Sequence, residues 1–194
     1  MKLAMIAAMD VNNGIGKDNA LPWRCGEDLM RFKALTEGCV CVMGRNTFDS
    51  LKGLLPERRH VVITSNVDKF WSDRAYLRTI EDIDQKLMVV DSFKKALVVC
   101  NSTHDVPRIW FIGGKSIYDQ AIDIVDEVWL TRMVGEWQCD TKLMNDEGMT
   151  KLYENFTHMS SPPDELVDRF GSVDFIARGA TLRTHRYVNL VRLK

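Results

Sequence analysis

One carboxylate has the surroundings that acid–base chemistry needs. Asp28 lies in the first turn of a helix expected over residues 26–36, on the face that also carries Leu29 and Phe32. Acidic residues are common at such positions because of the helix dipole, so a purely structural role stays open. If Asp28 instead faces an apolar cleft, its carboxyl group suits proton donation or the binding of a cationic ring.

Two glycine-marked junctions suggest an anionic ligand. Gly44-Arg45-Asn46-Thr47 follows an expected strand and opens a helix, and Gly113-Gly114-Lys115-Ser116 repeats this layout. A helix start offers free backbone N–H groups to an anion, and the forked side chain of Arg45 suits phosphate. Each junction alone could be an ordinary turn, and neither matches the common dinucleotide fingerprint or the P-loop. Together they predict a clamp on the two ends of one dinucleotide.

Other kinds of chemistry have little support in the sequence. The four histidines are scattered without the spacing of metal ligands, and no serine or cysteine forms an evident pair with a histidine base. We therefore expect no metal site and a reaction carried by a cofactor. Taken singly, Trp23, Arg58, Tyr118 and the hydroxyl pair Thr64-Ser65 all have ordinary structural explanations.

Composition excludes several classes of protein. The 194 residues carry a formal net charge of −1, which gives no general case for binding nucleic acid or an anionic membrane surface. No stretch reaches the roughly 20 apolar residues of a membrane helix, and no signal peptide is evident. The five cysteines are odd in number and lack a C-x-x-C pair, so we expect reduced thiols in a cytoplasmic protein.

Alternating apolar strands and amphipathic helices predict an α/β fold in a single domain over residues 1–194. Residues 10–22 are expected as a loop, and residues 172–177 and 183–193 as an antiparallel pair that turns near 178–180. The pattern predicts a central, mostly parallel mixed sheet, flanked by helices, with an antiparallel C-terminal hairpin. The expected strands lie at residues 2–9, 40–43, 59–64, 109–112 and 127–131, and the expected helices at 26–36, from 44 onward, and at 80–87, 92–99 and 116–122.

At these positions the sequence resembles the dihydrofolate reductase family. The resemblance covers residues 3–65 and 108–142, whereas residues 66–107 and 145–182 look expanded or divergent, and Lys115 stands where a third glycine is common. It rests on Ile6-Ala7-Ala8-Met9, Gly14-Ile15-Gly16, Asn19-Ala20-Leu21-Pro22-Trp23, Asp28-Leu29-x-x-Phe32-Lys33, Val42-Met43-Gly44-Arg45-x-Thr47-Phe48-x-Ser50-Leu51, Leu55-Pro56-x-Arg58, Ile112-Gly113-Gly114 with Ile117-Tyr118, Leu130-Thr131 and Asp140-Thr141.

The resemblance implies an enzyme that uses NADPH to reduce dihydrofolate to tetrahydrofolate, by hydride transfer to pterin C6 and protonation at N5. Asp28 would bind the pterin and support the protonation, Trp23 would hold a water, and Arg58 would bind the substrate's glutamate carboxylate. The implied catalytic residues are Asp28, Trp23, Leu21, Tyr118 and Thr131. The implied substrate-binding residues are Ile6, Ala8, Asp28, Leu29, Phe32, Leu51, Arg58, Ile112 and Thr131. The implied cofactor-binding residues are Ala8, Ile15, Gly16, Asn19, Leu21, Gly44, Arg45, Asn46, Thr47, Thr64, Ser65, Ile112, Gly113, Gly114, Lys115, Ser116, Ile117 and Tyr118.

Two other interpretations stay open. A pyrimidine reductase of riboflavin synthesis resembles this fold and uses the same cofactor, although the Asp28 helix and Leu55-Pro56-x-Arg58 count against it. The second is a non-catalytic scaffold that binds a partner through the long segments. The resemblance adds antifolates as expected ligands and places the activity in one-carbon metabolism and thymidylate synthesis. Self-association and docking to a thymidylate synthase are left open.

Overall fold

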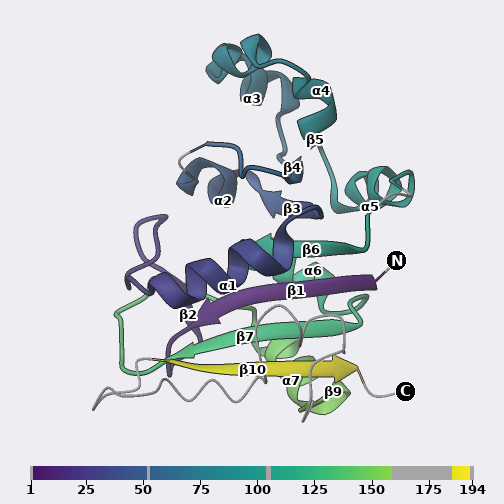
Figure 1. The fold of residues 1–194 in the computed structure, drawn as a ribbon. Coiled ribbons are helices and arrows are strands. Elements are labelled where there is room, and N and C mark those ends of the chain that lie inside the picture. Colours follow the sequence, from purple (N-terminus) through teal and green to yellow (C-terminus); the bar gives the residue numbers. More distant parts are fainter. Residues whose placement is uncertain (1, 52, 104–105, 159–184, 193–194) are drawn as a thin grey trace.

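An eight-stranded sheet forms the centre of the computed structural model (Figure 1). The structure describes residues 2–51, 53–103, 106–158 and, as backbone, 185–192. The strand order is β5-β4-β3-β6-β1-β7-β10-β9, and β2 and β8 form a separate pair. The strands are β1 (Lys2–Met9), β2 (Gly14–Gly16), β3 (Val40–Gly44), β4 (Arg59–Ile63), β5 (Leu87–Val90), β6 (Arg108–Gly113), β7 (Glu127–Met133), β8 (Thr141–Lys142), β9 (Phe156–His158) and β10 (His185–Arg192).

The six strands from β5 to β7 run parallel, and β10 pairs antiparallel with both β7 and β9. The expected α/β class, with a mostly parallel sheet and an antiparallel C-terminal edge, is confirmed. The strand expected at residues 172–177 and the turn at 178–180 lie outside the described residues. In the described part of the chain, β10 finds its partners in β7 and β9 instead.

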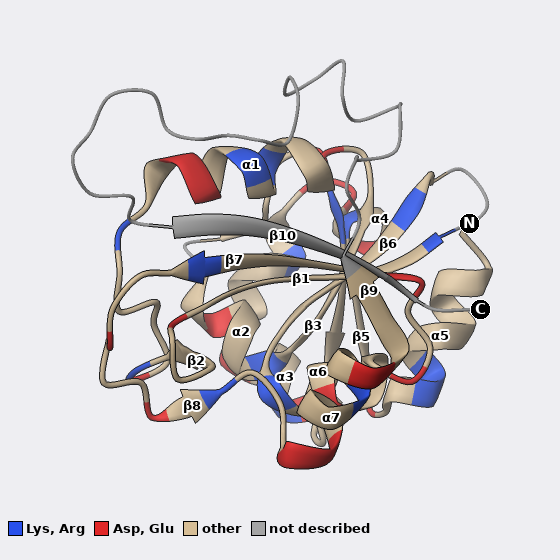
Figure 2. Cartoon of the chain, turned by 90° about the horizontal axis from the view of Figure 1, so that it is seen from below, with Lys and Arg blue, Asp and Glu red and all other residues tan. Residues whose placement is uncertain are grey.

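The helices cover both faces of the sheet, as Figure 2 shows for α1 on one side and α6 and α7 on the other. Alternate side chains of β3 explain why both faces must be covered: Val40 and Val42 enter one apolar cluster, while Cys41 and Met43 enter the other. The helical elements are α1 (Gly26–Thr36), α2 (Arg45–Ser50), α3 (Val67–Asp73), η1 (Ala75–Thr79), α4 (Ile83–Lys86), α5 (Phe93–Asn101), α6 (Lys115–Ala121) and α7 (Asp146–Asn155).

The expectation of one helix over residues 80–87 is wrong. A single turn, α4, is followed at Leu87 by β5, which pairs in parallel with β4 at the edge of the sheet. Four consecutive apolar residues suit a strand or a buried helical turn equally well, so the free edge of β4 decides the outcome. The sequence also gave no sign of α3 and η1, whereas α5 confirms the helix expected at 92–99.

The loop expected at residues 10–22 contains a short strand. Gly14 and Gly16 of β2 pair with Lys142 and Thr141 of β8, and Lys17 forms a bridge with Ala20. The loop therefore has a partner from a segment more than a hundred residues away, and this pairing fixes where its tip lies.

Candidate active site

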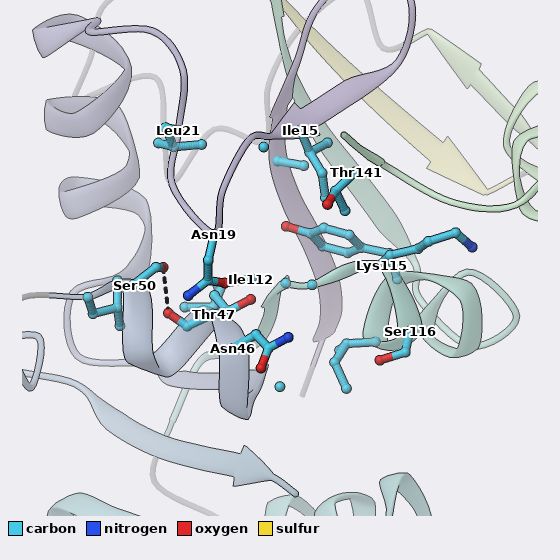
Figure 3. Close-up of a pocket in the computed structure, with 18 of the residues that line it drawn as sticks. Ile15, Asn19, Leu21, Asn46, Thr47, Ser50, Ile112, Lys115, Ser116 and Thr141 are labelled. Atoms are coloured by element: carbon cyan, nitrogen blue, oxygen red, sulfur yellow. Dashed lines mark hydrogen bonds between the residues drawn. The ribbon is translucent and has the colours of Figure 1, made fainter. Parts of the chain in front are cut away.

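A cleft of about 720 Å³ opens at the edge of the sheet where β1, β3, β4 and β6 end. Figure 3 shows Asn19 of the loop, Asn46 and Thr47 of α2, and Lys115 and Ser116 of α6 around the same space. The expected site residues that line the cleft are Ile6, Ala8, Ile15, Gly16, Asn19, Leu21, Asp28, Leu29, Phe32, Gly44, Arg45, Asn46, Thr47, Leu51, Thr64, Ser65, Ile112, Gly113, Gly114, Lys115, Ser116, Ile117 and Tyr118.

The two glycine-marked junctions lie against each other. β3 and β6 are neighbours in the sheet and run parallel, so the helices that follow them start at the same edge. A Cβ added at Gly113 would lie 3.0 Å from Thr47 Oγ1 and 3.4 Å from the Tyr118 hydroxyl, and Gly113 has a φ of +132°. A Cβ added at Gly44 would lie 3.8 Å from the backbone nitrogen of Gly114. Glycine is required at Gly113 because the conformation is left-handed and the adjoining helix is close.

Hydrogen bonds hold the loop of residues 10–22 beside these two junctions. Asp10 is buried, and its carboxylate accepts from the backbone N–H of Gly14 at 2.7 Å and of Trp137 at 3.1 Å. Burial alone would raise the pKa of Asp10, but these backbone donors lower it, so the group stays charged. Asp140 accepts from the N–H of Asp18 at 2.7 Å. Both carboxylates hold the loop in the position that brings its tip to the cleft.

Asp28 faces the cleft from α1 and is bonded to a residue of β7. The hydroxyl of Thr131 donates to Asp28 Oδ1, and Thr131 itself is only 1% exposed. Arg31, one turn further along α1, donates to the same hydroxyl oxygen at 3.5 Å. Because the Thr131 hydroxyl proton is directed at the carboxylate, the remaining oxygen Oδ2 is the one left to meet a ligand in the cleft. This arrangement fits a group that binds a cationic ring edge or assists a proton transfer.

Tyr118 closes the floor of the cleft. Its hydroxyl donates to the backbone carbonyl of Ile6 at 2.9 Å, and the side chain is buried. Burial and, to a lesser extent, the charge of Asp28 raise the pKa of Tyr118. The phenol therefore stays protonated and links α6 to β1 as a fixed donor.

Three expected site residues, Thr131, Trp23 and Arg58, do not line the cleft. Thr131 is linked to it by its hydrogen bond to Asp28. Trp23 is buried edge-on against Trp137, with centroids 6.0 Å apart, and its indole nitrogen has no partner among the described residues. Arg58 is 7% exposed; its Nε donates to Thr36 Oγ1 at 3.2 Å and its Nη2 to the Lys33 carbonyl at 3.1 Å. Arg58 thus ties its loop to the end of α1.

Six lining residues were not anticipated: Ala7, Ala20, Ser50, Ile63, Gln120 and Thr141. Ala7, Ser50 and Ile63 adjoin anticipated residues and could have been found from their neighbours. Thr141 enters the cleft because β8 pairs with β2, and this contact between distant segments has no local sequence signal.

Comparisons with known proteins identify the family of this chain. The family model described as "Dihydrofolate reductase" matches residues 2–165. The chain belongs to the dihydrofolate reductase family. It is 38% identical to "Dihydrofolate reductase type 9" of Escherichia coli, over 73% of this chain and 75% of that one, and 34% identical to "Dihydrofolate reductase" of Bacillus subtilis (strain 168), over 77% and 80%. The resemblance drawn from the motifs is thereby confirmed.

The match to longer proteins is partial. The chain is 36% identical to a "Bifunctional dihydrofolate reductase-thymidylate synthase" of Paramecium tetraurelia, but spans only 28% of that protein's length. Among solved structures, "Dihydrofolate reductase from Enterococcus faecalis complexed with NADP(H)and RAB-propyl" shares 22% identity with a TM-score of 0.71, covering 100% of this chain and 97% of that one. This similarity shows that the chain has the same fold as that structure.

Two other features are absent from the described residues. No group of three or more histidine, cysteine or acidic residues could hold a metal ion there. Nor does that part of the chain include a helix long and apolar enough to cross a membrane. The five cysteines are all free thiols.

Proposed function

We propose that this member of the dihydrofolate reductase family reduces dihydrofolate to tetrahydrofolate with NADPH, and so feeds one-carbon metabolism and thymidylate synthesis. The observation that carries the proposal is the position of Asp28. Asp28 is hydrogen-bonded to Thr131 and lines the same cleft as the two glycine-marked helix starts, which would bind an anion together. A carboxylate for a pterin and a clamp for a dinucleotide therefore face one space.

The cleft fits NADPH on two grounds. Its volume of about 720 Å³ lies within the range of small-molecule sites, roughly 300–1,000 Å³. The bare backbone at Gly113 and Gly114 leaves room that a Cβ would fill, and a ligand can approach it closely. When bound, NADPH supplies the hydride. Its phosphates would be held by the residues of the two junctions and by Thr64 and Ser65, with Arg45 at the 2′-phosphate.

The side chains around the pterin would orient it and handle the proton. Leu29, Phe32 and Leu51 offer an apolar wall to its rings, and Asp28 Oδ2 would accept from its amino group and N3. The carboxyl group would thereby stabilise a developing positive charge and favour protonation at N5. The docked loop, with Leu21 at the mouth, would exclude water from the reacting atoms.

Arg58 does not line the cleft, although the resemblance implies that it binds the substrate's carboxylate. Its bonds to the end of α1 use part of its five donors, which leaves others for a substrate carboxylate that reaches the gap between α1 and the 54–58 loop. We keep it as the proposed carboxylate ligand, with a second role in fixing this gap. Five free thiols suit a reducing compartment, so we place the enzyme in the cytoplasm.

A rate assay tests the proposal. The purified chain should oxidise NADPH when dihydrofolate is added, as read by the loss of NADPH absorbance. Asp28→Asn should lower kcat by roughly 10²–10⁴-fold and change the pH–rate profile, because it removes the charge without removing the side chain's volume. Its circular dichroism and melting temperature should match the wild type, which shows that the fold is intact.

The same assay separates the alternatives. Turnover of a ribosylamino-pyrimidine in place of dihydrofolate would identify a riboflavin-pathway reductase. No turnover of either substrate by a folded, NADPH-binding protein would identify a non-catalytic scaffold. Wild-type rates in Asp28→Asn would remove the role assigned to Asp28.

A further inference from the structure

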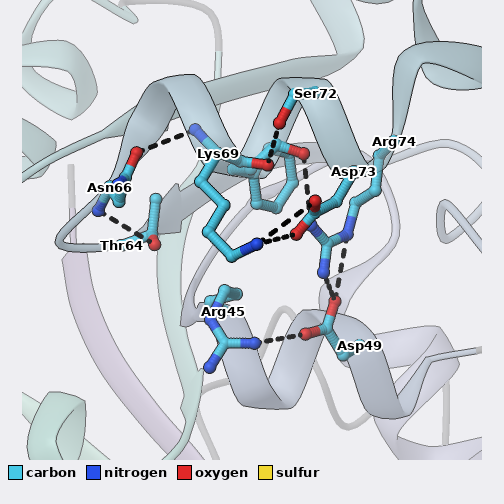
Figure 4. A network of polar contacts seen from close by, with 9 residues as sticks. Arg45, Asp49, Thr64, Asn66, Lys69, Ser72, Asp73 and Arg74 are labelled. Carbon is cyan, nitrogen blue, oxygen red and sulfur yellow. Dashed lines mark hydrogen bonds and ion pairs between the residues drawn. The ribbon is translucent and has the colours of Figure 1, made fainter.

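Asp49 of α2 joins two arginines from different parts of the chain (Figure 4). Its Oδ2 accepts from Arg45 Nη1 at 2.9 Å. Its Oδ1 accepts from Arg74 Nε at 3.1 Å and from Arg74 Nη2 at 2.5 Å. Arg45 lines the cleft, whereas Arg74 does not line it and follows α3, in the divergent segment 66–107. One carboxylate is thus shared between a cleft arginine and an arginine behind it.

The two arginines are held to different degrees. Besides its two bonds to Asp49, Arg74 donates from Nη1 to the Phe70 carbonyl at 3.1 Å and lies over the Phe70 ring, 4.5 Å from its centroid. Its side chain is 15% exposed, against 48% for Arg45. Arg74 is therefore the fixed partner of Asp49, and Arg45 is the partner that can turn toward a ligand.

We propose that Arg74 is a positioning residue for cofactor selectivity: by neutralising Asp49, it releases the Arg45 guanidinium to the 2′-phosphate of NADPH. The inference rests on the proposed function, which assigns Arg45 to that phosphate. A carboxylate paired with Arg45 alone would cancel its charge and would repel a phosphate dianion. With two arginines on one carboxylate, the cluster keeps a net charge of +1 beside the cleft, and one fork keeps free donors.

The charge balance predicts a specific loss in Arg74→Met. This change keeps the length of the side chain and its packing on Phe70 but leaves Asp49 with Arg45 as its cation. The ratio of the NADH and NADPH dissociation constants, measured by quenching of tryptophan fluorescence, should fall about threefold to tenfold, the size expected for one partly exposed charge near an anion. In steady-state assays the loss should appear in the KM for NADPH rather than in kcat.

A second variant separates charge balance from a merely structural role. In Arg74→Met with Asp49→Asn, both the carboxylate and its fixed partner lose their charge, so Arg45 is released again and most of the NADPH preference should return. Arg74→Lys should keep an intermediate preference, because it retains the charge but not the fork. If Arg74 only supported the fold, the double variant would be worse than the single one, and both cofactors would weaken equally.

A matched control and the wild type complete the design. Lys95 of α5 forms an exposed ion pair with Asp91, just before α5, with Nζ and Oδ2 2.6 Å apart. Lys95→Met breaks this pair and should leave the ratio of the two cofactor dissociation constants unchanged. An unchanged ratio in Arg74→Met, in a wild type that prefers NADPH, would overturn this inference alone. A wild type that does not bind NADPH would overturn the proposed function and this inference with it.

Discussion

Gly14 is the position at which the smallest change should have the clearest effect on the loop. A Cβ added there would lie 2.3 Å from Cys139 Cβ and 2.6 Å from Cys139 Sγ. Both distances are far below contact, so Gly14→Ala must push β2 away from the segment before β8. Forcing extra atoms into a packed site costs about 1–3 kcal/mol, which corresponds to roughly a 5- to 150-fold smaller equilibrium constant for docking of the loop.

Gly14→Ala should affect the rate of catalysis more than the thermal stability of the fold. If the docked loop is the catalytically competent form, kcat/KM for dihydrofolate should fall by a factor within that range. The melting temperature should fall by roughly 2–12 °C, because each 1 kcal/mol shifts a domain of this size by roughly 2–4 °C. Stopped-flow single-turnover rates with NADPH and dihydrofolate measure the first quantity, and differential scanning calorimetry measures the second.

Cys139→Gly supplies the rescue and Gly26→Ala the control. Cys139→Gly removes the two atoms that lie nearest the new Cβ and leaves only the milder contact with Asp10 Oδ1 at 3.1 Å, so the Gly14→Ala, Cys139→Gly double variant should recover most of the lost rate. A Cβ added at Gly26 meets nothing within 4 Å, so Gly26→Ala should behave as the wild type. The reasoning would be refuted if Gly14→Ala kept its full rate, or if removal of the Cys139 side chain gave no recovery.

Three further outcomes follow from single sites. His60 is buried, its Nε2 accepts from the Leu55 N–H at 3.0 Å, and burial lowers its pKa. As the pH falls, the imidazole of the unfolded chain is therefore protonated before that of the folded chain, so the folding stability should be complete above about pH 6.5 and decrease below it. Urea titrations at several pH values should show this decrease, and it should be less steep in His60→Asn. Glu127→Gln should cost about 3 kcal/mol in urea unfolding with little change in kcat, because it leaves Arg108 with an uncompensated charge at the edge of the sheet opposite the cleft. Arg45→Ala should weaken NADPH more than NADH in equilibrium titrations, and equal weakening would deny Arg45 a role at the 2′-phosphate.

The chemistry of the site was predictable where it is local. A buried strand that ends in glycine and runs into a helix reports a helix start at the edge of the sheet, and this holds at Gly44 and at Gly113. The two junctions meet because β3 and β6 are neighbours, a pairing that each strand's own sequence does not specify. Residue types and spacing therefore predicted the two helix starts, and tertiary structure decided that they lie against each other.

The rest depended on contacts between distant residues. Leu87–Val90 became β5 because β4 offered a free edge, and Arg58 donates to the Lys33 carbonyl and the Thr36 hydroxyl at the end of α1. The bond from Thr131 to Asp28 joins residues 103 positions apart, and that from Arg74, in the divergent segment, to Asp49 joins residues 25 apart. No periodicity encodes such pairs, since each depends on how separate elements pack. Family resemblance predicted a role for Thr131 beside Asp28 but gave no indication of Arg74.

The hydrogen bonds around Asp28 and those around Asp49 should affect catalysis independently, and this independence can be measured. The bond of Asp28 to Thr131 joins α1 to β7, and the bonds of Asp49 to Arg74 join α2 to the residue after α3. In the described structure these two sets share no residue, so free-energy changes in kcat/KM should add for Asp28→Asn with Arg74→Met, within about 0.5 kcal/mol. Asp28→Asn with Thr131→Val should instead lose less than the sum, because each change removes the same hydrogen bond. Additive losses in the second pair, or strong coupling in the first, would contradict the division of the cleft into a pterin end and a phosphate end.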